Sequence, residues 1–250
     1  MRVNLYWTRH GLSCANALRL EGHSILEDIL SLVNLAKNRG QKYPNAPLTM
    51  IGVQQCIKTN QKIKKSKKFP KNFDLVCSSE LLRAIETASL VYFKPNKLGK
   101  KNSVTILPFI NELRWNITRY LGIDKDNEPQ TINKTKKRYK EFKKQIEYKN
   151  APQLNYHFIK KNFHQRTEPD VDMFKEEVLP LLLKKFKKKK EVNIAIVCHR
   201  EFMKKYFDSK TRYFNTAVVL QSFDWTDCCE IENEKVNQIY EGLDYKGLGM

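Results

Sequence analysis

The sequence VNLYWTRHG, residues 3–11, predicts a short buried strand that ends at an arginine and a histidine. Val3 to Thr8 are mainly apolar or β-forming residues, and Gly11 permits a sharp backbone turn after His10. Strand tips are where α/β proteins place ligand-binding side chains. Arg9 and His10 are therefore candidate site residues.

The same pattern recurs later in the chain. The most clearly buried strand covers Ile194 to Cys198 and ends at His199. Further strands are predicted at residues 73–78, 104–107, 216–223 and 236–240, with helical patterns between them. Alternating strands and helices predict an α/β fold, here a three-layer αβα sandwich with a mainly parallel central sheet. Its ligands are expected at the carboxyl ends of the strands.

Polar residues mark several expected helix starts. Thr49 is placed to cap a helix that begins at residues 48–52, and Ser79 to cap one that begins at Glu80. Apolar residues at helical spacing predict a helix in the segment that follows Gly11 and continues to Ala36. Another helix is predicted to start near residues 167–170, where Thr-Glu-Pro-Asp resembles a capping box.

The length of 250 residues is compatible with a single domain, residues 1–250. Residues 114–166 are polar, lysine-rich and weakly periodic. This segment is expected to be an insertion or cap over the sheet rather than part of the core.

Composition indicates a folded protein with a strongly basic surface. Its formal net charge is +19, which favours anionic partners such as phosphorylated small molecules or nucleic acid. Much of this charge is lysine in solvated patterns, which often has no specific partner. No apolar run reaches the length of a membrane span, and six irregularly spaced cysteines do not form a secreted disulfide pattern. We expect a cytoplasmic protein with reduced thiols.

The charged residues at the predicted strand ends suit phosphoryl transfer. That reaction spreads negative charge over the phosphoryl oxygens, so it needs cationic donors, an in-line nucleophile and an acid for the leaving oxygen. Arg9 and Arg83 can supply bidentate guanidinium groups. His10 and His199 can supply imidazoles that are partly unprotonated near neutral pH.

Several segments together resemble the histidine phosphatase (phosphoglycerate mutase-like) superfamily. Its RHG signature is similar to residues 9–11, and its LTxxGxxQ helix start is similar to LTMIGVQ at residues 48–54. Its SSxxxRAxxTA segment is similar to SSELLRAIETA at residues 78–88. Asn16, Glu112 and His199 stand at positions that resemble its usual asparagine, acid and second histidine. The resemblance spans residues 8–199.

This resemblance implies a role for each matching residue. His10 would attack phosphorus and form a phosphohistidine, while Arg9, Arg83 and His199 would bind the phosphoryl oxygens. Glu112 would protonate the leaving group and then help to activate water. Asn16 is expected at the substrate. No metal or cofactor is implied.

Two departures from the family pattern bear on function. Arg200 and Glu201 follow the second histidine, where the family usually has glycine, so Arg200 either adds a substrate phosphate contact or crowds the pocket. The tyrosine- and glycine-rich segment typical of the family's mutases is missing after Glu112. The missing segment favours a phosphatase over a phosphoglycerate-type mutase. The charge of +19 and Arg200 favour a small phosphorylated metabolite with more than one phosphate as the substrate, with a phosphoprotein as the alternative.

The sequence also contains features of other classes of protein. Cys77 and Arg83 have the C-x5-R spacing of cysteine-dependent phosphatases, but the five residues between them lack glycine and include Glu80. The remaining histidines and cysteines match no zinc-ligand spacing. A function of another class is a catalytically weak protein whose basic surface binds a polyanion.

Overall fold

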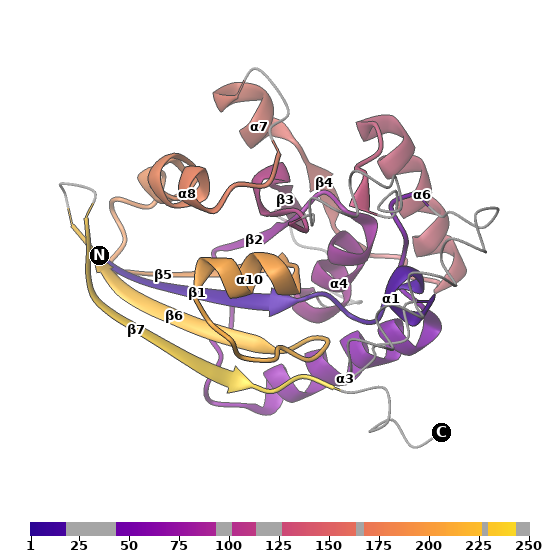
Figure 1. Cartoon of the computed structure of the whole chain (residues 1–250), viewed down its shortest axis with the longest axis horizontal. Helices are drawn as coiled ribbons and strands as arrows, with labels where there is room; N and C mark the ends of the chain where they lie inside the picture. Colours follow the sequence, from indigo (N-terminus) through magenta and orange to yellow (C-terminus); the bar gives the residue numbers. More distant parts are fainter. Residues whose placement is uncertain (19–43, 94–101, 114–126, 164–167, 227–229, 244–250) are drawn as a thin grey trace.

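The structure is a computed structural model and describes residues 1–18, 44–93, 102–113, 127–163, 168–226 and 230–243. Its strands form one sheet in the order β4-β3-β2-β5-β1-β6-β7 (Figure 1). Neighbours from β4 to β1 pair in parallel, and β6 and β7 add two antiparallel pairings. The predicted α/β class with a mainly parallel sheet is confirmed. The strands are β1 (Arg2–Arg9), β2 (Leu75–Ser78), β3 (Ser103–Ile106), β4 (Gln153–Asn155), β5 (Glu191–Cys198), β6 (Val218–Trp225) and β7 (Ile231–Tyr240).

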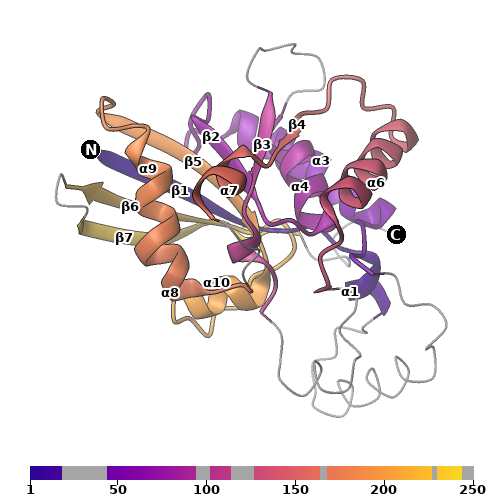
Figure 2. The ribbon, with the colours of Figure 1, turned by 90° about the horizontal axis from the view of Figure 1, so that it is seen from above.

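Helices cover both faces of this sheet, which makes three layers (Figure 2). One face carries α3 (Met50–Lys65), α4 (Leu82–Tyr92) and α6 (Ile132–Gln145). The other carries α8 (Val171–Met173), α9 (Leu179–Lys184) and α10 (Arg200–Tyr206), with a π-helical turn at Phe174–Val178 joining α8 to α9. Short helices α1 (Cys14–Leu18), α7 (His157–Asn162) and a 3-10 turn, η1 (Pro108–Ile110), complete the described elements. None of the described helices is long and apolar enough to cross a membrane.

The central strand β5 shows why the sheet is buried on both sides. Ile194 and Ile196 pack in the cluster beneath α8–α10, whereas Ala195 and Val197 pack in the cluster beneath α3, α4 and α6. Successive side chains of a strand point to opposite faces, so a continuous apolar run needs two apolar layers.

The described part of residues 114–166 corrects the expectation of a cap. Strand β4 pairs with β3 and forms one edge of the sheet. Helix α6 packs on α4, and its Tyr139 and Phe142 are buried in the same core cluster as α4. Residues 132–155 therefore belong to the sheet and its helical layer. Lysine-rich composition hid this because only one face of α6 is apolar.

Helix starts agree with the sequence in part. Thr49 caps α3 as predicted, since its side chain accepts a hydrogen bond from the Gly52 amide. Helix α4 starts at Leu82 rather than Glu80, and Ser79 does not cap it. Asp170 caps α8 through the amides of residues 172 and 173, while Thr167 lies outside the described residues. Most of the helix expected up to Ala36 also lies outside them.

The segment after His10 lies beside the segment that leads into α3. Ser13 and Leu48 form an isolated antiparallel bridge. Next to it, the Thr49 amide donates to the Leu12 carbonyl at 2.9 Å and the Cys14 amide donates to the Pro47 carbonyl at 3.0 Å. Glycine is required at position 52, where a Cβ atom would lie 2.1 Å from the Leu12 oxygen. Residues 12–14 are thus held against the start of α3.

Candidate active site

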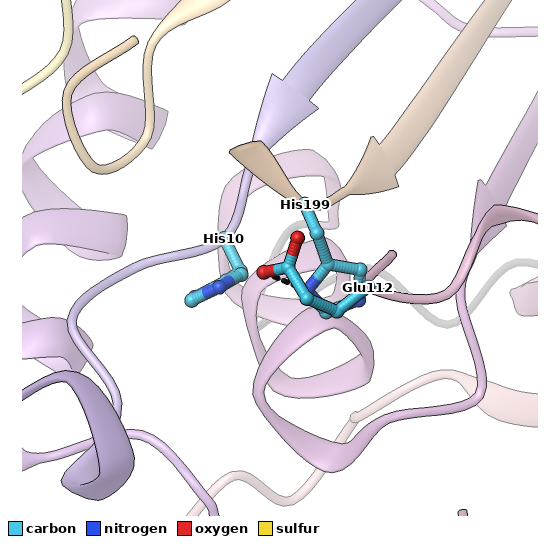
Figure 3. Close-up of side chains that lie close together, drawn as sticks. All are labelled: His10, Glu112 and His199. Atoms are coloured by element: carbon cyan, nitrogen blue, oxygen red, sulfur yellow. Dashed lines mark ion pairs between the residues drawn. The ribbon is translucent and has the colours of Figure 1, made fainter. Parts of the chain in front are cut away.

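Neighbouring strand ends bring the candidate residues to one edge of the sheet. His10 follows β1 and His199 follows β5, and these strands pair in parallel with Arg9 opposite Cys198. Strand β2, on the other side of β5, leads through Ser79 to Arg83 in the first turn of α4. Figure 3 shows His10 and His199 at adjacent strand ends with the Glu112 carboxylate facing them.

His10 is a buried imidazole whose tautomer is set by its neighbours. Its Nδ1 lies 2.6 Å from the Gly11 carbonyl oxygen, which can only accept, so Nδ1 carries the proton. Its Nε2 accepts a hydrogen bond from Arg83 Nε at 3.3 Å. Burial, and then the positive charges of Arg83 and Arg9, hold the pKa of His10 well below its usual range. His10 is therefore neutral, with a lone pair on Nε2.

Several hydrogen bonds fix the backbone on both sides of this imidazole. The His10 amide donates to the Cys198 carbonyl at 3.1 Å, and the His10 carbonyl accepts from Asn215 Nδ2 at 3.0 Å. The Gly11 amide donates to Thr87 Oγ1 at 3.0 Å. The nucleophile candidate is thus held by β5, by α4 and by the loop before β6.

His199 is fully buried and is hydrogen-bonded to Ser79. Ser79 Oγ lies 2.7 Å from His199 Nε2 and also accepts from the Leu81 amide at 3.3 Å. His199 Nδ1 faces Glu112 Oε2 at 3.6 Å and has no hydrogen-bond partner within the described ranges. Burial and nearby Arg83 hold the pKa of His199 well below its usual range.

Glu112 stands two residues beyond η1 and its side chain is 16% exposed. Its Oε1 accepts a hydrogen bond from the Glu201 amide at 3.2 Å. Burial raises the pKa of this carboxyl, and the positive charge of Arg83 opposes the rise. A raised pKa keeps more of the protonated form that a general acid needs.

Three arginines surround these groups. Arg83 is 2% exposed and donates from Nη2 to Asn127 Oδ1 at 2.5 Å. Arg9 is 3% exposed and donates from Nη1 to the Tyr213 carbonyl at 2.7 Å. Arg200, more exposed, forms an ion pair with Glu201 at 2.8 Å, and its charge reaches both His10 and Glu112.

The structure brings together most residues that the sequence singled out. His10, Arg83, Glu112 and His199 meet through the contacts above, and Arg9 and Arg200 lie close enough to perturb their titration. Asn16 is different: it lies in α1, its amide donates to Ser13 Oγ, and no described hydrogen bond joins its side chain to this group.

Several residues that support the site were not predicted from the sequence. Ser79 was expected as a helix cap rather than as a partner of His199. Asn127, which holds Arg83, and Asn215, which holds the His10 carbonyl, lie in irregular segments that carry no motif. Thr87 stood inside a recognised segment, but nothing in its spacing indicated a bond to the Gly11 amide.

The alternative nucleophile Cys77 is poorly placed. It is fully buried and packs in the cluster beneath α8–α10. Burial raises the pKa of its thiol to about 12, so it stays protonated at physiological pH. A thiol in this state is not a nucleophile.

The electrostatics of the site favour an anion over a cation. His10, Glu112 and His199 offer three atoms within 4.8 Å of one another, a set that could ligate a metal ion. The guanidinium of Arg83, however, donates to His10 Nε2 itself. The charges of Arg83 and Arg9 would repel a divalent cation at this position and attract a phosphoryl group.

Solved structures share this architecture. No protein-family model matches the sequence, and no curated protein matches it. A mycobacterial glucosyl-3-phosphoglycerate phosphatase aligns over 97% of this chain and 100% of its own, with 12% identity and a TM-score of 0.50. This chain has the fold of that phosphatase.

Two further structures match with lower TM-scores. Phosphoserine phosphatase from Entamoeba histolytica, in complex with 3-phosphoglyceric acid, aligns over 97% of this chain and 98% of its own, with 17% identity and a TM-score of 0.46. Phosphoglycerate mutase from Bacillus anthracis aligns over 98% and 95%, with 17% identity and a TM-score of 0.49. At these identities the likeness concerns the fold alone.

Proposed function

We propose that this protein is a phosphomonoester hydrolase that works through a phosphohistidine on His10. In the first step the Nε2 lone pair attacks phosphorus and the bond from phosphorus to the leaving oxygen breaks. Protonated Glu112 gives its proton to that oxygen, so the leaving group departs as an alcohol. Arg9, Arg83 and His199 stabilise the charge on the transferring phosphoryl oxygens.

The second step returns the enzyme to its starting state. The Glu112 carboxylate removes a proton from water as the water oxygen attacks the phosphohistidine. The bond between phosphorus and Nε2 breaks, inorganic phosphate leaves and His10 regains its lone pair. Every cationic group in this scheme is a side chain, so the proposal includes no metal.

One observation carries this proposal. His10 Nδ1 donates its proton to the Gly11 carbonyl. The lone pair of His10 is therefore on Nε2, which faces the buried guanidinium of Arg83. An anion bound by that guanidinium would lie beside Nε2, and the hydrogen bond from Arg83 Nε breaks as the lone pair attacks phosphorus. A histidine that served only to fill the core would not need two buried arginines beside it.

The decisive experiment traps the intermediate. Wild-type protein is mixed with a radiolabelled aryl phosphate and quenched in alkali, and we expect acid-labile, alkali-stable label on His10. His10→Ala should carry no label and release no phosphate, whereas His157→Ala, at an exposed histidine of α7, should match the wild type. Label retained by folded His10→Ala would refute the proposal.

We propose a small phosphorylated metabolite as the substrate, with more than one phosphate group. The net charge of +19 and the position of Arg200 beside His10 and Glu112 support this preference. Comparing kcat/KM for mono- and bisphosphorylated esters at low salt tests it, and equal values would contradict it. Analysis of the products separates the two activities. A hydrolase releases inorganic phosphate, whereas a mutase moves the phosphate to a second hydroxyl.

A polyanion-binding role is the alternative of another class. Folded wild-type protein that turns over no phosphate ester, yet binds single-stranded nucleic acid with strong salt dependence, would favour that role instead.

A further inference from the structure

Glu80 and Asn111 form a reciprocal pair of hydrogen bonds next to the site. The Glu80 backbone amide donates to Asn111 Oδ1 at 3.1 Å, and Asn111 Nδ2 donates to Glu80 Oε1 at 2.9 Å. A backbone amide can only donate and a carboxylate can only accept, so chemistry alone fixes the orientation of the Asn111 amide. The two residues lie 31 positions apart in the chain.

Both residues of this pair are buried. Glu80 is 2% exposed and Asn111 is 5% exposed. Burying polar side chains costs free energy unless their hydrogen bonds are made, and this contact makes them. The contact therefore ties together the two segments that carry Glu80 and Asn111.

Both partners are chain neighbours of residues in the proposed mechanism. Glu80 follows Ser79, which bonds to His199, and Asn111 precedes Glu112. One residue-pair thus joins the segment that orients His199 to the segment that carries the proposed acid. The Leu107 amide, which donates to the Ser78 carbonyl at 2.8 Å, joins the same two segments on the other side of η1.

We propose that Glu80 and Asn111 are positioning residues that hold the Glu112 carboxyl at the leaving oxygen. This inference rests on the proposed function, in which Glu112 is the general acid. Neither residue touches the phosphoryl group. They fix the backbone from which Glu112 reaches His199, while the Glu201 amide fixes the carboxyl itself.

The first test compares leaving groups. Asn111→Ala should lose on the order of 10²-fold in kcat with glycerol phosphate, whose leaving oxygen needs a proton, because general acid catalysis is worth this much. With dinitrophenyl phosphate, whose leaving group departs unprotonated, the loss should be small. Asn60→Ala is the matched control, since it removes another buried amide, one that donates to the Val91 carbonyl away from the site.

The second test uses pH. In Asn111→Asp a protonated carboxyl can accept from the Glu80 amide and donate its proton to the Glu80 carboxylate. Once ionised, it faces that carboxylate as a like charge. Turnover of glycerol phosphate by this variant, taken as a ratio to wild-type turnover, should therefore fall as pH rises. Glu80→Gln keeps an acceptor for Asn111 Nδ2 and should retain most activity.

The outcomes separate this inference from the proposed function. Wild-type protein that hydrolyses neither ester defeats the proposed function. Active wild-type protein with Asn111→Ala equally impaired on both esters, or unimpaired on both, overturns the positioning role. If Asn111→Ala does not fold, Asn111→Asp is measured at low and high pH instead. Turnover of glycerol phosphate that does not depend on pH more strongly than in the wild type then overturns the positioning role.

Discussion

The side-chain amide of Asn215 donates to the His10 carbonyl, and the backbone carbonyl of the same asparagine accepts from the Leu243 amide at 2.8 Å. Gln55 makes a second connection, because it accepts from the Leu12 amide and donates to the Leu243 carbonyl at 3.0 Å. The segment before residue 244 is therefore joined by two routes to the loop that carries the nucleophile candidate.

Gly242→Ala should weaken this connection. Gly242 has a φ of +89°, and a Cβ atom there would lie 2.4 Å from the Asn215 oxygen. We expect a loss of stability of about 1 kcal/mol or more, together with lower turnover. Thermal unfolding and phosphatase assays measure both. Leu243→Ala, which keeps the backbone bonds, should have the smaller effect on turnover, and the reverse order would contradict the connection.

Ser79→Ala should disturb the orientation of the His199 imidazole. The substitution leaves the buried Nε2 without its partner, which costs about 1–3 kcal/mol, and removes the bond that holds the ring. Turnover per folded molecule should fall, which a loss of stability alone would not cause. Ser89→Ala removes another fully buried hydroxyl from α4 and is the control. Equal turnover in the two variants would show that Ser79 has no special role.

The pH dependence of kcat/KM should have two limbs. His10 must be neutral, so activity falls as pH drops through its lowered pKa. Glu112 must be protonated for the first step, so activity falls as pH rises through its raised pKa. Glu112→Gln should remove the alkaline limb and lower the rate on the order of 10² to 10⁴-fold with poor leaving groups. An alkaline limb that persists in this variant would assign it to another group.

Glu86 should make stability depend on pH. It is 1% exposed, and burial raises its pKa to about 8, against an ordinary value of 4.5. Between these values the folded chain keeps a proton that the unfolded chain releases, so stability is full below about pH 4.5 and falls until about pH 8. Glu86→Gln preserves an acceptor for the Leu48 amide and should flatten this slope in denaturant unfolding. An unchanged slope would contradict the raised pKa.

Cys77→Ser should leave the chemistry intact. Because Cys77 packs under α8–α10 with a protonated thiol, we expect normal kcat and a modest loss of stability from placing a hydroxyl in an apolar cluster. Phosphatase activity abolished in folded Cys77→Ser, but present in His10→Ala, would reverse the assignment of the nucleophile.

The strand ends of the site could be predicted because local sequence patterns decide them. The runs rich in apolar residues before His10 and His199 indicate buried strands, and parallel pairing places their carboxyl ends together. The same reasoning predicted six of the seven strands. Strand β4 escaped because it has three residues, Gln153–Asn155, with one exposed and two half-buried side chains and no apolar alternation.

Features decided by long-range contacts could not be predicted. Helix α6 reads as a lysine-rich solvated helix, yet its few apolar residues fill the core beside α4. The bond between Asn111 and Glu80 and the bond between Asn215 and His10 depend on loop conformations that no local pattern specifies. Asparagine in a loop is ordinarily a turn residue, so its identity carries no signal of a buried partner.

The bridge between Ser13 and Leu48 joins the segment that follows His10 to the start of helix α3. Gly52, in the first turn of that helix, lets the backbone of Leu12 approach it without an intervening side chain. Helix α3 therefore serves as a support for the segment next to the candidate nucleophile. An engineer who wishes to redesign the surface of this protein should leave Leu48, Thr49 and Gly52 unchanged.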